Sequence, residues 1–243
     1  MSYAMFLLVF LVPPIIVGAW YFLKNNDNAA KKTTGYSIIT LVVLAVSYTT
    51  PWDNYLVKTE VWSYGPDRVI GTIGFVPIEE YGFFILQTVI TGLWYFFLQN
   101  KLGLSRQAHS NKYLKHTISV FYFALIVFGI YGLNQDPTRY LSLILVWALP
   151  VVLLQWLVGG QYLLKNLKLF AVIVLVPTVY LCFGDAFAIT DEIWLISPQQ
   201  TTGIKFGPLP LEEAVFFLIT NWMVAQGMIL FNIMGKRVLS YVS

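Results

Sequence analysis

Two pairs of adjacent carboxylates stand out in a chain that carries few charges. The segments VPIEEYGFF and LPLEEAVFF place Glu79 beside Glu80 and Glu212 beside Glu213. Two neighbouring acids in a poorly hydrated pocket do not both ionise easily, so one of each pair is expected to keep a proton that it can donate. Aromatic rings follow each pair, and the faces of such rings stabilise cations. These residue types favour protonation of an alkene, with the resulting carbocation held by aromatic side chains.

The motif also has a purely structural explanation. Proline suits the first turn of a helix because its missing N–H needs no partner there, and acids in that turn interact favourably with the helix dipole. A functional role is favoured because the same helical face is polar after both motifs. Counting four, seven and eight residues onward, Glu80 is followed by Phe84, Gln87 and Thr88, and Glu213 by Phe217, Thr220 and Asn221. We therefore predict that the second acid of each pair points inward and that the first lies nearer the rim.

A longer repeat surrounds these motifs. Asp53, Glu60 and Trp62 recur with the same spacing as Asp185, Glu192 and Trp194, 132 residues later. After one extra residue, a glycine, a proline, both glutamates and two phenylalanines recur at an offset of 133. We expect three helices in each repeat, over residues 1–110 and 136–243, joined by a helix within 111–135. Equivalent helices then point the same way, so both acidic motifs open on one side of the bundle.

The composition indicates the elements that must hold these residues. The chain has 243 residues, 58% of them hydrophobic and 11% charged, with a mean hydropathy of +0.69, whereas soluble domains carry about 25% charge. Stretches of about 20 apolar residues can each cross a membrane as a helix. The expected fold is an all-α polytopic membrane bundle with seven spans, near residues 3–23, 34–50, 78–98, 117–133, 139–158, 169–186 and 211–234.

Smaller features of this bundle follow from the same pattern. The first span lacks a basic start and a small-residue cleavage site, so it is not expected to be a cleaved signal peptide. The single Cys182 falls inside a predicted helix and is interpreted as a packing residue. A loop of roughly 25 residues follows the second helix of each repeat and is expected to cover the mouth of the bundle without regular strands.

Charge predicts the orientation in the membrane. The excess of Lys and Arg marks the cytoplasmic face, which leaves the N-terminus outside and the C-terminus cytoplasmic. The acids, apart from Asp27, gather at the opposite face, and basic loops beside a membrane give no argument for nucleic-acid binding. Eleven of the fifteen basic residues lie on one side: Lys24, Lys31, Lys32, Lys101, Arg106, Lys112, Lys115, Lys165, Lys168, Lys236 and Arg237.

The segments PIEE at 77–80, PLEE at 210–213 and PWD at 51–53, with Trp62 downstream, resemble the small integral-membrane lycopene cyclases. That family occurs as heterodimers of three-helix subunits in some bacteria and as fused chains in archaea and in bifunctional fungal enzymes. The resemblance covers nearly the whole chain. It departs at 182–185, where CFGD stands in place of a second PWD. The resemblance implies cyclisation of lycopene to γ-carotene and then β-carotene, without net oxidation.

The resemblance also implies residue roles. Glu80 and Glu213 are the leading acid candidates. Glu79 and Glu212 are partners that raise their pKa or take the final proton, and Asp53 and Asp185 are supporting carboxylates. The residues expected to contact substrate are Trp52, Trp62, Phe83, Phe84, Trp194, Phe216, Phe217, Thr88 and Asn221.

The expected partners are lycopene and other lipid-soluble carotenoids, membrane lipid, and other enzymes of the carotenoid pathway. No cofactor is expected, because the sequence has no Gly-x-Gly-x-x-Gly fingerprint for a flavin or a nicotinamide. No metal is expected either, because His109 and His116 fall together in a solvated cytoplasmic loop.

Three alternatives compare poorly or remain open. A retinal-binding rhodopsin needs a lysine in its last helix, and residues 211–234 contain none. A transporter with parallel repeats is the stronger rival, although its acids would be expected at mid-membrane rather than at one mouth. Within the enzyme interpretation, a cyclase of C50 carotenoids remains an alternative to a lycopene β-cyclase.

Overall fold

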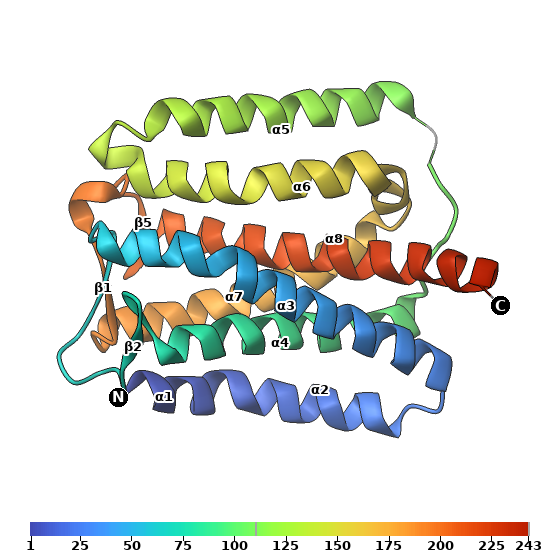
Figure 1. Cartoon of the computed structure of the whole chain (residues 1–243), viewed down its shortest axis with the longest axis horizontal. Coiled ribbons are helices and arrows are strands. Elements are labelled where there is room, and N and C mark those ends of the chain that lie inside the picture. Colours follow the sequence, from blue (N-terminus) through green and yellow to red (C-terminus); the bar gives the residue numbers. More distant parts are fainter. Residues whose placement is uncertain (110, 243) are drawn as a thin grey trace.

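The chain forms a bundle of long helices lying roughly side by side (Figure 1). The structure is a computed structural model that describes residues 1–109 and 111–242, with side chains as far as Met234. Within these residues seven helical spans are long and apolar enough to cross a membrane, as the hydropathy predicts. They are Tyr3–Lys24, Asn28–Lys58, Ile78–Leu102, Lys112–Gly132, Asp136–Lys165, Leu167–Thr190 and Leu211–Met234.

The first span is continuous but contains a local irregularity. It comprises α1 (Tyr3–Phe6), a π-helical turn η1 (Leu7–Leu11) and α2 (Val12–Lys24), which has two prolines in its first turn. Pro14 has no N–H to donate to the carbonyl of Phe10, four residues earlier. The Tyr180 hydroxyl donates to that carbonyl instead, at 2.6 Å. The proline pair therefore creates a bond between the first and sixth spans.

Two helices occupy the centre of the bundle. These are α4 (Ile78–Leu102) and α8 (Leu211–Val242), which pack on each other and each begin with an acidic pair. The surrounding helices are α2, α3 (Asn28–Lys58), α6 (Arg139–Lys165) and α7 (Leu167–Thr190). Helix α5 (Lys112–Gly132) packs on α6 at the edge of the bundle (Figure 1). Both acidic motifs thus start helices that are shielded on several sides.

Helix α3 is longer than the sequence predicts. The expected span near 34–50 extends to Asn28–Lys58, and the helix continues across Pro51. Trp52 and Asp53 therefore lie inside a helix, beyond the end near residue 50 that was expected for this span. The loop between α3 and α4 is correspondingly shorter.

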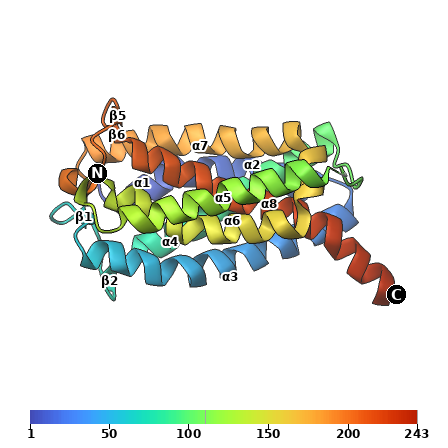
Figure 2. The same cartoon turned by 90° about the horizontal axis from the view of Figure 1, so that it is seen from above.

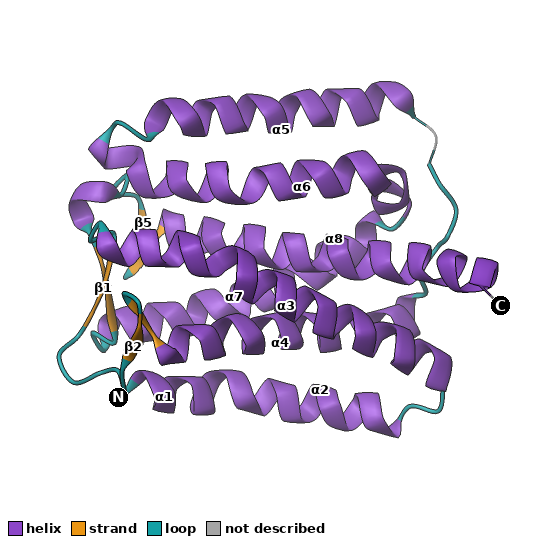
Figure 3. Ribbon diagram, in the orientation of Figure 1, coloured by secondary structure: helices purple, strands orange, loops and turns teal. Residues whose placement is uncertain are grey.

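The two capping loops, residues 59–77 and 191–210, contain short strands, contrary to expectation. Strand β1 (Trp62–Tyr64) of the first loop pairs antiparallel with β4 (Trp194–Ile196) of the second, with Tyr64 opposite Trp194. Each loop also forms a small hairpin, β2 (Thr72–Ile73) with β3 (Val76–Pro77) and β5 (Lys205–Phe206) with β6 (Leu209–Pro210). The 3₁₀ turn η3 (Pro198–Gln200) lies in the second loop and packs against the 3₁₀ turn η2 (Asp136–Thr138), which precedes α6. Figures 2 and 3 show the strands gathered at the end of the bundle that carries the N-terminus.

Helices α3 and α7 end in the same way. Glu60 and Glu192 adopt positive φ angles of 58° and 53° directly after the two helices. The next N–H groups turn back to the helix, from Val61 to the Leu56 carbonyl and from Ile193 to the Ala188 carbonyl. This is the Schellman arrangement that stops a helix and redirects the chain. It explains the repeated Glu-x-Trp spacing, because each tryptophan then begins a strand.

Candidate functional site

The structure brings Glu80 and Glu213 to one pocket, although they are 133 residues apart. Both side chains are buried in the first turns of α4 and α8. The cavity measures about 20 Å³, which is room for roughly one water molecule. We call it the acid pocket. It is lined by Tyr3, Trp62, Tyr64, Glu80, Phe83, Asp185, Trp194, Ile196, Glu213, Phe216 and Phe217.

Each inward glutamate accepts a hydrogen bond from a tyrosine. The Tyr140 hydroxyl donates to Glu213 Oε1 at 2.7 Å, and the Tyr64 hydroxyl donates to Glu80 Oε1 at 3.0 Å. Burial raises the pKa of Tyr64, and the adjacent Glu80 charge acts in the same direction. The Tyr64 phenol therefore keeps its proton and stays a donor. Two dipoles thus fix the orientation of the two carboxyl groups.

Sequence reasoning missed the tyrosines at the starts of the first and fifth spans. Tyr140 lies at the start of α6 and Tyr3 at the start of α1, where Tyr3 packs on Trp194 with ring centroids 4.9 Å apart. Tyr140 packs edge-on against Trp62 at 5.8 Å. Tyr3 and Tyr140 lie near the starts of corresponding spans but are 137 residues apart, so the 132-residue offset of the repeat does not align them. Trp194 therefore contacts the tyrosine that opens the first span, and Trp62 contacts the tyrosine that opens the fifth.

The two supporting aspartates differ in their surroundings. Asp185 lines the acid pocket and accepts a hydrogen bond from Trp194 Nε1 at 2.8 Å. Asp53 is fully buried, and neither of its oxygens has a hydrogen-bond partner. It lies close enough to Glu80 and Glu213 for their charges to interact. The aspartates therefore belong to the same polar cluster but are not equivalent.

Glu79 and Glu212 hold the capping loops. Glu79 Oε1 accepts the backbone N–H of Ile70 at 2.8 Å, and Glu212 Oε1 accepts both the N–H and the hydroxyl of Thr202 at 2.7 and 2.8 Å. Both glutamates are as buried as the inward pair, at 5% and 0% exposure. This differs from the rim position predicted for them, because each reaches under its own loop.

Aromatic rings form most of the pocket wall. Phe216 stacks on Trp52 at 5.7 Å with 9° between the ring planes, and it meets Trp62 edge-on at 5.7 Å. Of the aromatic residues predicted to contact substrate, five line the acid pocket directly: Trp62, Phe83, Trp194, Phe216 and Phe217. Trp52 lies behind Phe216. The wall presents several faces and edges toward the carboxyl groups.

A second, larger cavity adjoins the acid pocket. It measures about 220 Å³ and is lined by helices α3, α4, α6 and α8. Phe84 and Thr88, both predicted to contact substrate, line this cavity, and Phe216 lines both cavities. Asn221 lines neither of them.

The Asn221 side chain joins three helices instead. It is fully buried, accepts the Thr91 hydroxyl at 2.6 Å and donates to the Thr178 hydroxyl at 3.2 Å. These bonds connect α8 with α4 and α7. The structure therefore places Asn221 in helix packing and away from either cavity.

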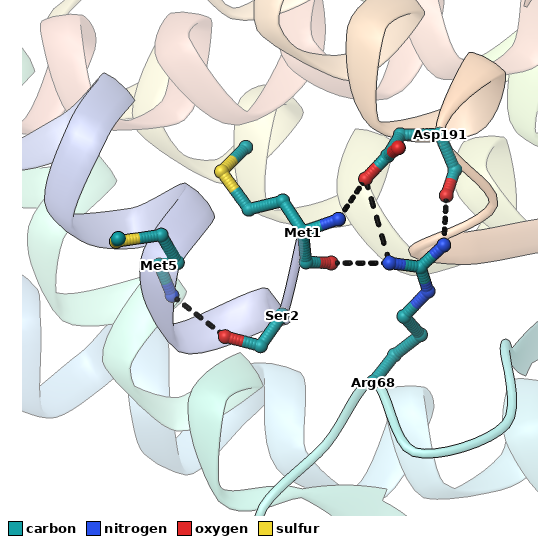
Figure 4. Close-up of polar contacts among 5 residues, drawn as sticks. All are labelled: Met1, Ser2, Met5, Arg68 and Asp191. Carbon is teal, nitrogen blue, oxygen red and sulfur yellow. Dashed lines mark hydrogen bonds and ion pairs between the residues drawn. The ribbon is translucent and has the colours of Figure 1, made fainter.

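An ionic cluster ties the two capping loops together (Figure 4). Arg68 of the first loop donates to the carbonyl of Asp191 in the second at 2.7 Å and to the carbonyl of Met1 at 2.9 Å. The Asp191 carboxylate pairs with the amino group of Met1 and with Arg68. The bond from the amino group, with the Arg68 charge, lowers the pKa of Asp191. The roof over the acid pocket is thus joined by charge as well as by strands β1 and β4.

These features define a multi-pass membrane protein with a buried carboxyl site at one end of its helices. A lycopene cyclase family model matches residues 1–98 and 137–233. The chain belongs to the lycopene cyclase family.

Relatives of known name agree with this family. The chain is 42% identical over 233 residues to a lycopene beta-cyclase of Halobacterium salinarum, covering 95% of each chain. It is 37% identical to a bifunctional lycopene cyclase/phytoene synthase of Podospora anserina over 79% of this chain and 34% of the fungal one. The corresponding protein of Neurospora crassa is 35% identical over 95% of this chain and 40% of its own length. No solved structure matches the chain.

Proposed function

We propose that this protein is a lycopene β-cyclase, which converts the acyclic ends of lycopene to β-ionone rings by way of γ-carotene. Family membership and the name of the Halobacterium relative support the substrate. The observation that carries the proposal is the meeting of Glu80 and Glu213 in one aromatic pocket beside an apolar cavity. This combination suits a hydrocarbon that must be protonated away from water.

The reaction is a balanced isomerisation. A carboxylic acid adds a proton to C2 of the terminal double bond, which leaves a cation at C1. The electrons of the 5,6 double bond form the C1–C6 bond, and a base then removes a proton from C6. One proton enters and one leaves, so no oxidant or reductant is consumed. The protein must supply an acid, a base and stabilisation of the cation.

The site residues divide among these tasks. Glu213 and Glu80 are the proposed acids, and the tyrosine that donates to each orients the carboxyl group and stabilises the carboxylate left after proton transfer. Phe216 and Trp62 present aromatic surfaces to the cation. Asp185, which has an unpartnered oxygen beside the pocket, is a supporting carboxylate together with Asp53.

The outer glutamates act beside the proposed acids. Glu79 and Glu212 position the capping loops through the hydrogen bonds described above. Each also keeps one buried oxygen without a partner. That oxygen can interact with the neighbouring acid or accept the final proton.

The proposed orientation places the acid pocket at the non-cytoplasmic end. The excess of Lys and Arg at the opposite end supports a cytoplasmic C-terminus. Carotenoid substrate and product then exchange with the surrounding lipid, and other enzymes of the carotenoid pathway are proposed neighbours. No flavin, nicotinamide or metal is part of the proposed reaction.

Glutamate-to-glutamine variants test the proposal. In lycopene-accumulating bacteria, the wild-type chain is expected to produce cyclised carotenoids, separated by chromatography. Glu80→Gln and Glu213→Gln should each lower conversion roughly 100-fold or more at equal protein level, because general acid catalysis contributes about 10²–10⁴-fold. Glu192→Gln is the matched control, since that side chain is exposed in the same group of loops. Full activity in both pocket variants would remove these acids from the mechanism.

A further inference from the structure

We infer that the larger cavity is the binding groove for the polyene chain of the carotenoid, and that Phe216 separates this groove from the acid pocket. The inference rests on the proposed function and deepens it. The polyene groove is lined by Leu41, Leu44, Ala45, Tyr48, Thr49, Phe84, Gln87, Thr88, Trp147, Val151, Gln155, Phe216, Thr220, Met223 and Val224. Twelve of these fifteen residues were not singled out as substrate contacts from the sequence.

The groove is elongated along the helix axes, as a binding site for an extended chain must be. Its lining runs from Leu41 to Thr49 along α3 and from Trp147 to Gln155 along α6. Eight residues of helix span roughly 12 Å, so the groove follows the helix axes for about that distance. Its volume of about 220 Å³ is below the roughly 300–1,000 Å³ of pockets that enclose a drug-sized ligand. It therefore accommodates part of a long chain whose remainder extends into lipid.

The lining chemistry suits a hydrocarbon. The polar groups within it are largely satisfied by the protein itself: Gln87 donates to the Thr220 hydroxyl at 2.7 Å, and Thr88 donates to the carbonyl of Phe84 at 2.8 Å. Gln155 Nε2 donates to the Met223 carbonyl, while its Oε1 is unpartnered. That oxygen lies at the far end of the groove from the acid pocket, since Gln155 is two turns beyond Trp147. The part of the groove nearest the acid pocket therefore needs no hydrogen bonds from the molecule that it binds.

The groove is closed toward the capping loops and open toward the outer surface of the bundle. The Tyr48 hydroxyl donates to the Trp147 carbonyl at 2.7 Å, and Trp52 Nε1 donates to the Leu143 carbonyl at 3.2 Å. These bonds join α3 to α6 beside the acid pocket. On α3, Leu44 is 53% exposed at the rim of the groove. A membrane-dissolved chain can therefore enter sideways between α3 and α6.

Phe216 occupies the boundary between the two cavities. It is 3% exposed and lines both of them. The acid pocket, at about 20 Å³, has no room for a terminal isoprenoid unit while this ring is in place. The tip of the polyene reaches Glu213 only when the Phe216 ring turns aside. The same ring then lies against the cation, which links substrate admission to stabilisation.

Binding to a catalytically blocked protein tests the groove without relying on turnover. The probe is lycopene added to the Glu80→Gln/Glu213→Gln protein in phospholipid nanodiscs, with quenching of tryptophan fluorescence as the readout. Adding Ala45→Phe fills the groove from α3 and should weaken lycopene binding at least tenfold. Val43→Phe is the matched control, because Val43 is on the same helix, 59% exposed and outside the groove. Its affinity should stay within twofold of the parent.

A second pair of variants guards against misfolding of the first. Val151→Phe fills the groove from α6, and Leu154→Phe, at a position 62% exposed, is its control. Lycopene binding that is equally strong in both filled variants and both controls would overturn the inference. If a saturated C16 alkane competes with lycopene for the groove as effectively as lycopene itself does, the groove is a general acyl-chain site and the inference is overturned. If the wild-type protein binds lycopene in the groove but does not cyclise it, the proposed function is refuted and the binding groove stands.

Discussion

At the scale of single residues, the site depends on how a carboxyl group is held. Glu213 and Glu80 are buried among aromatic rings, yet each has a phenol donor on one oxygen. A donor on one oxygen fixes the rotation of the carboxyl group and leaves the other oxygen for the proposed proton transfer. The tyrosines are therefore positioning residues, and their loss should affect turnover more than binding.

The hydrogen bond from Tyr140 provides the sharper test. Tyr140→Phe should lower kcat roughly 10- to 100-fold with little change in KM, because a hydrogen bond to a charged group contributes about 1.5–3 kcal/mol. Purified protein in nanodiscs, assayed over a range of lycopene concentrations, separates the two constants. Tyr55→Phe is the control, since Tyr55 is 50% exposed. An equal rise in KM with kcat unchanged would show that Tyr140 acts in binding and not in orienting Glu213.

At the scale of elements, the capping loops are built as a pair. Strand β1 pairs with β4, Arg68 bonds to Asp191, and the Gly65 N–H donates to the Ile193 carbonyl at 3.2 Å. Trp62 and Tyr64 belong to one of these strands and Trp194 to the other. The geometry of the acid pocket therefore depends on how closely the two loops approach.

Gly65 is the point of closest approach. A Cβ atom there would lie 2.2 Å from the carbonyl oxygen of Glu192, and neither backbone can yield without moving its strand. Gly65→Ala should lower stability by about 1–3 kcal/mol, as overpacking commonly does, and reduce lycopene conversion as well. Thermal unfolding of the detergent-solubilised protein measures the first effect.

Gly71→Ala, in the same loop, is the control. The nearest atom to a Cβ at Gly71 is the terminal methyl of Ile78, at 3.7 Å, which is an ordinary contact. Wild-type unfolding in both variants would mean that the loops are not held in register by this contact.

The sequence predicts the long elements well and the short ones poorly. Seven apolar stretches are enough to locate seven spans, because each extends over many residues. Strands β1 and β4 have three residues each, too few for a periodic signal, and each strand's partner lies more than 100 residues away. The span expected near 34–50 stops short of Trp52 and Asp53, because the long helix continues across Pro51 to Lys58.

The spacing also fails to place Asn221, which was predicted to contact substrate and lines neither cavity. Asn221 is eight positions after Glu213, which rotates it roughly 80° from the glutamate around a helix of 3.6 residues per turn. Thr220, seven positions after, is only about 20° away and lines the polyene groove. The spacing predicts the polar face of α8. It does not show where that face stops lining the cavity, because this depends on where α7 packs against α8.

At the scale of the whole molecule, the two proposed repeats contribute unequally to one shared pocket. The position equivalent to Trp52 in the proposed repeat is Gly184, where a Cβ would meet Phe6 at 3.4 Å. A ring from α1 thus fills on one side the space that Trp52 fills from α3 on the other. Trp52 stacks at 4.2 Å on Trp147, which lines the polyene groove. The segment 182–185, which departs from Pro-Trp-Asp, therefore contributes no tryptophan at the position equivalent to Trp52.

The meeting of both acidic motifs in one small pocket has a consequence for the order of events. The two identical acyclic ends of lycopene lie at opposite ends of its polyene chain, and the acid pocket receives one end at a time. After the first ring closes, γ-carotene must therefore dissociate into the bilayer, reverse its orientation and bind again with its other end in the pocket. In a pulse of labelled lycopene chased with unlabelled lycopene, labelled γ-carotene should accumulate, and its passage to β-carotene should slow as the chase grows. Undiminished labelled β-carotene at every chase concentration would mean that both tips are processed in a single visit.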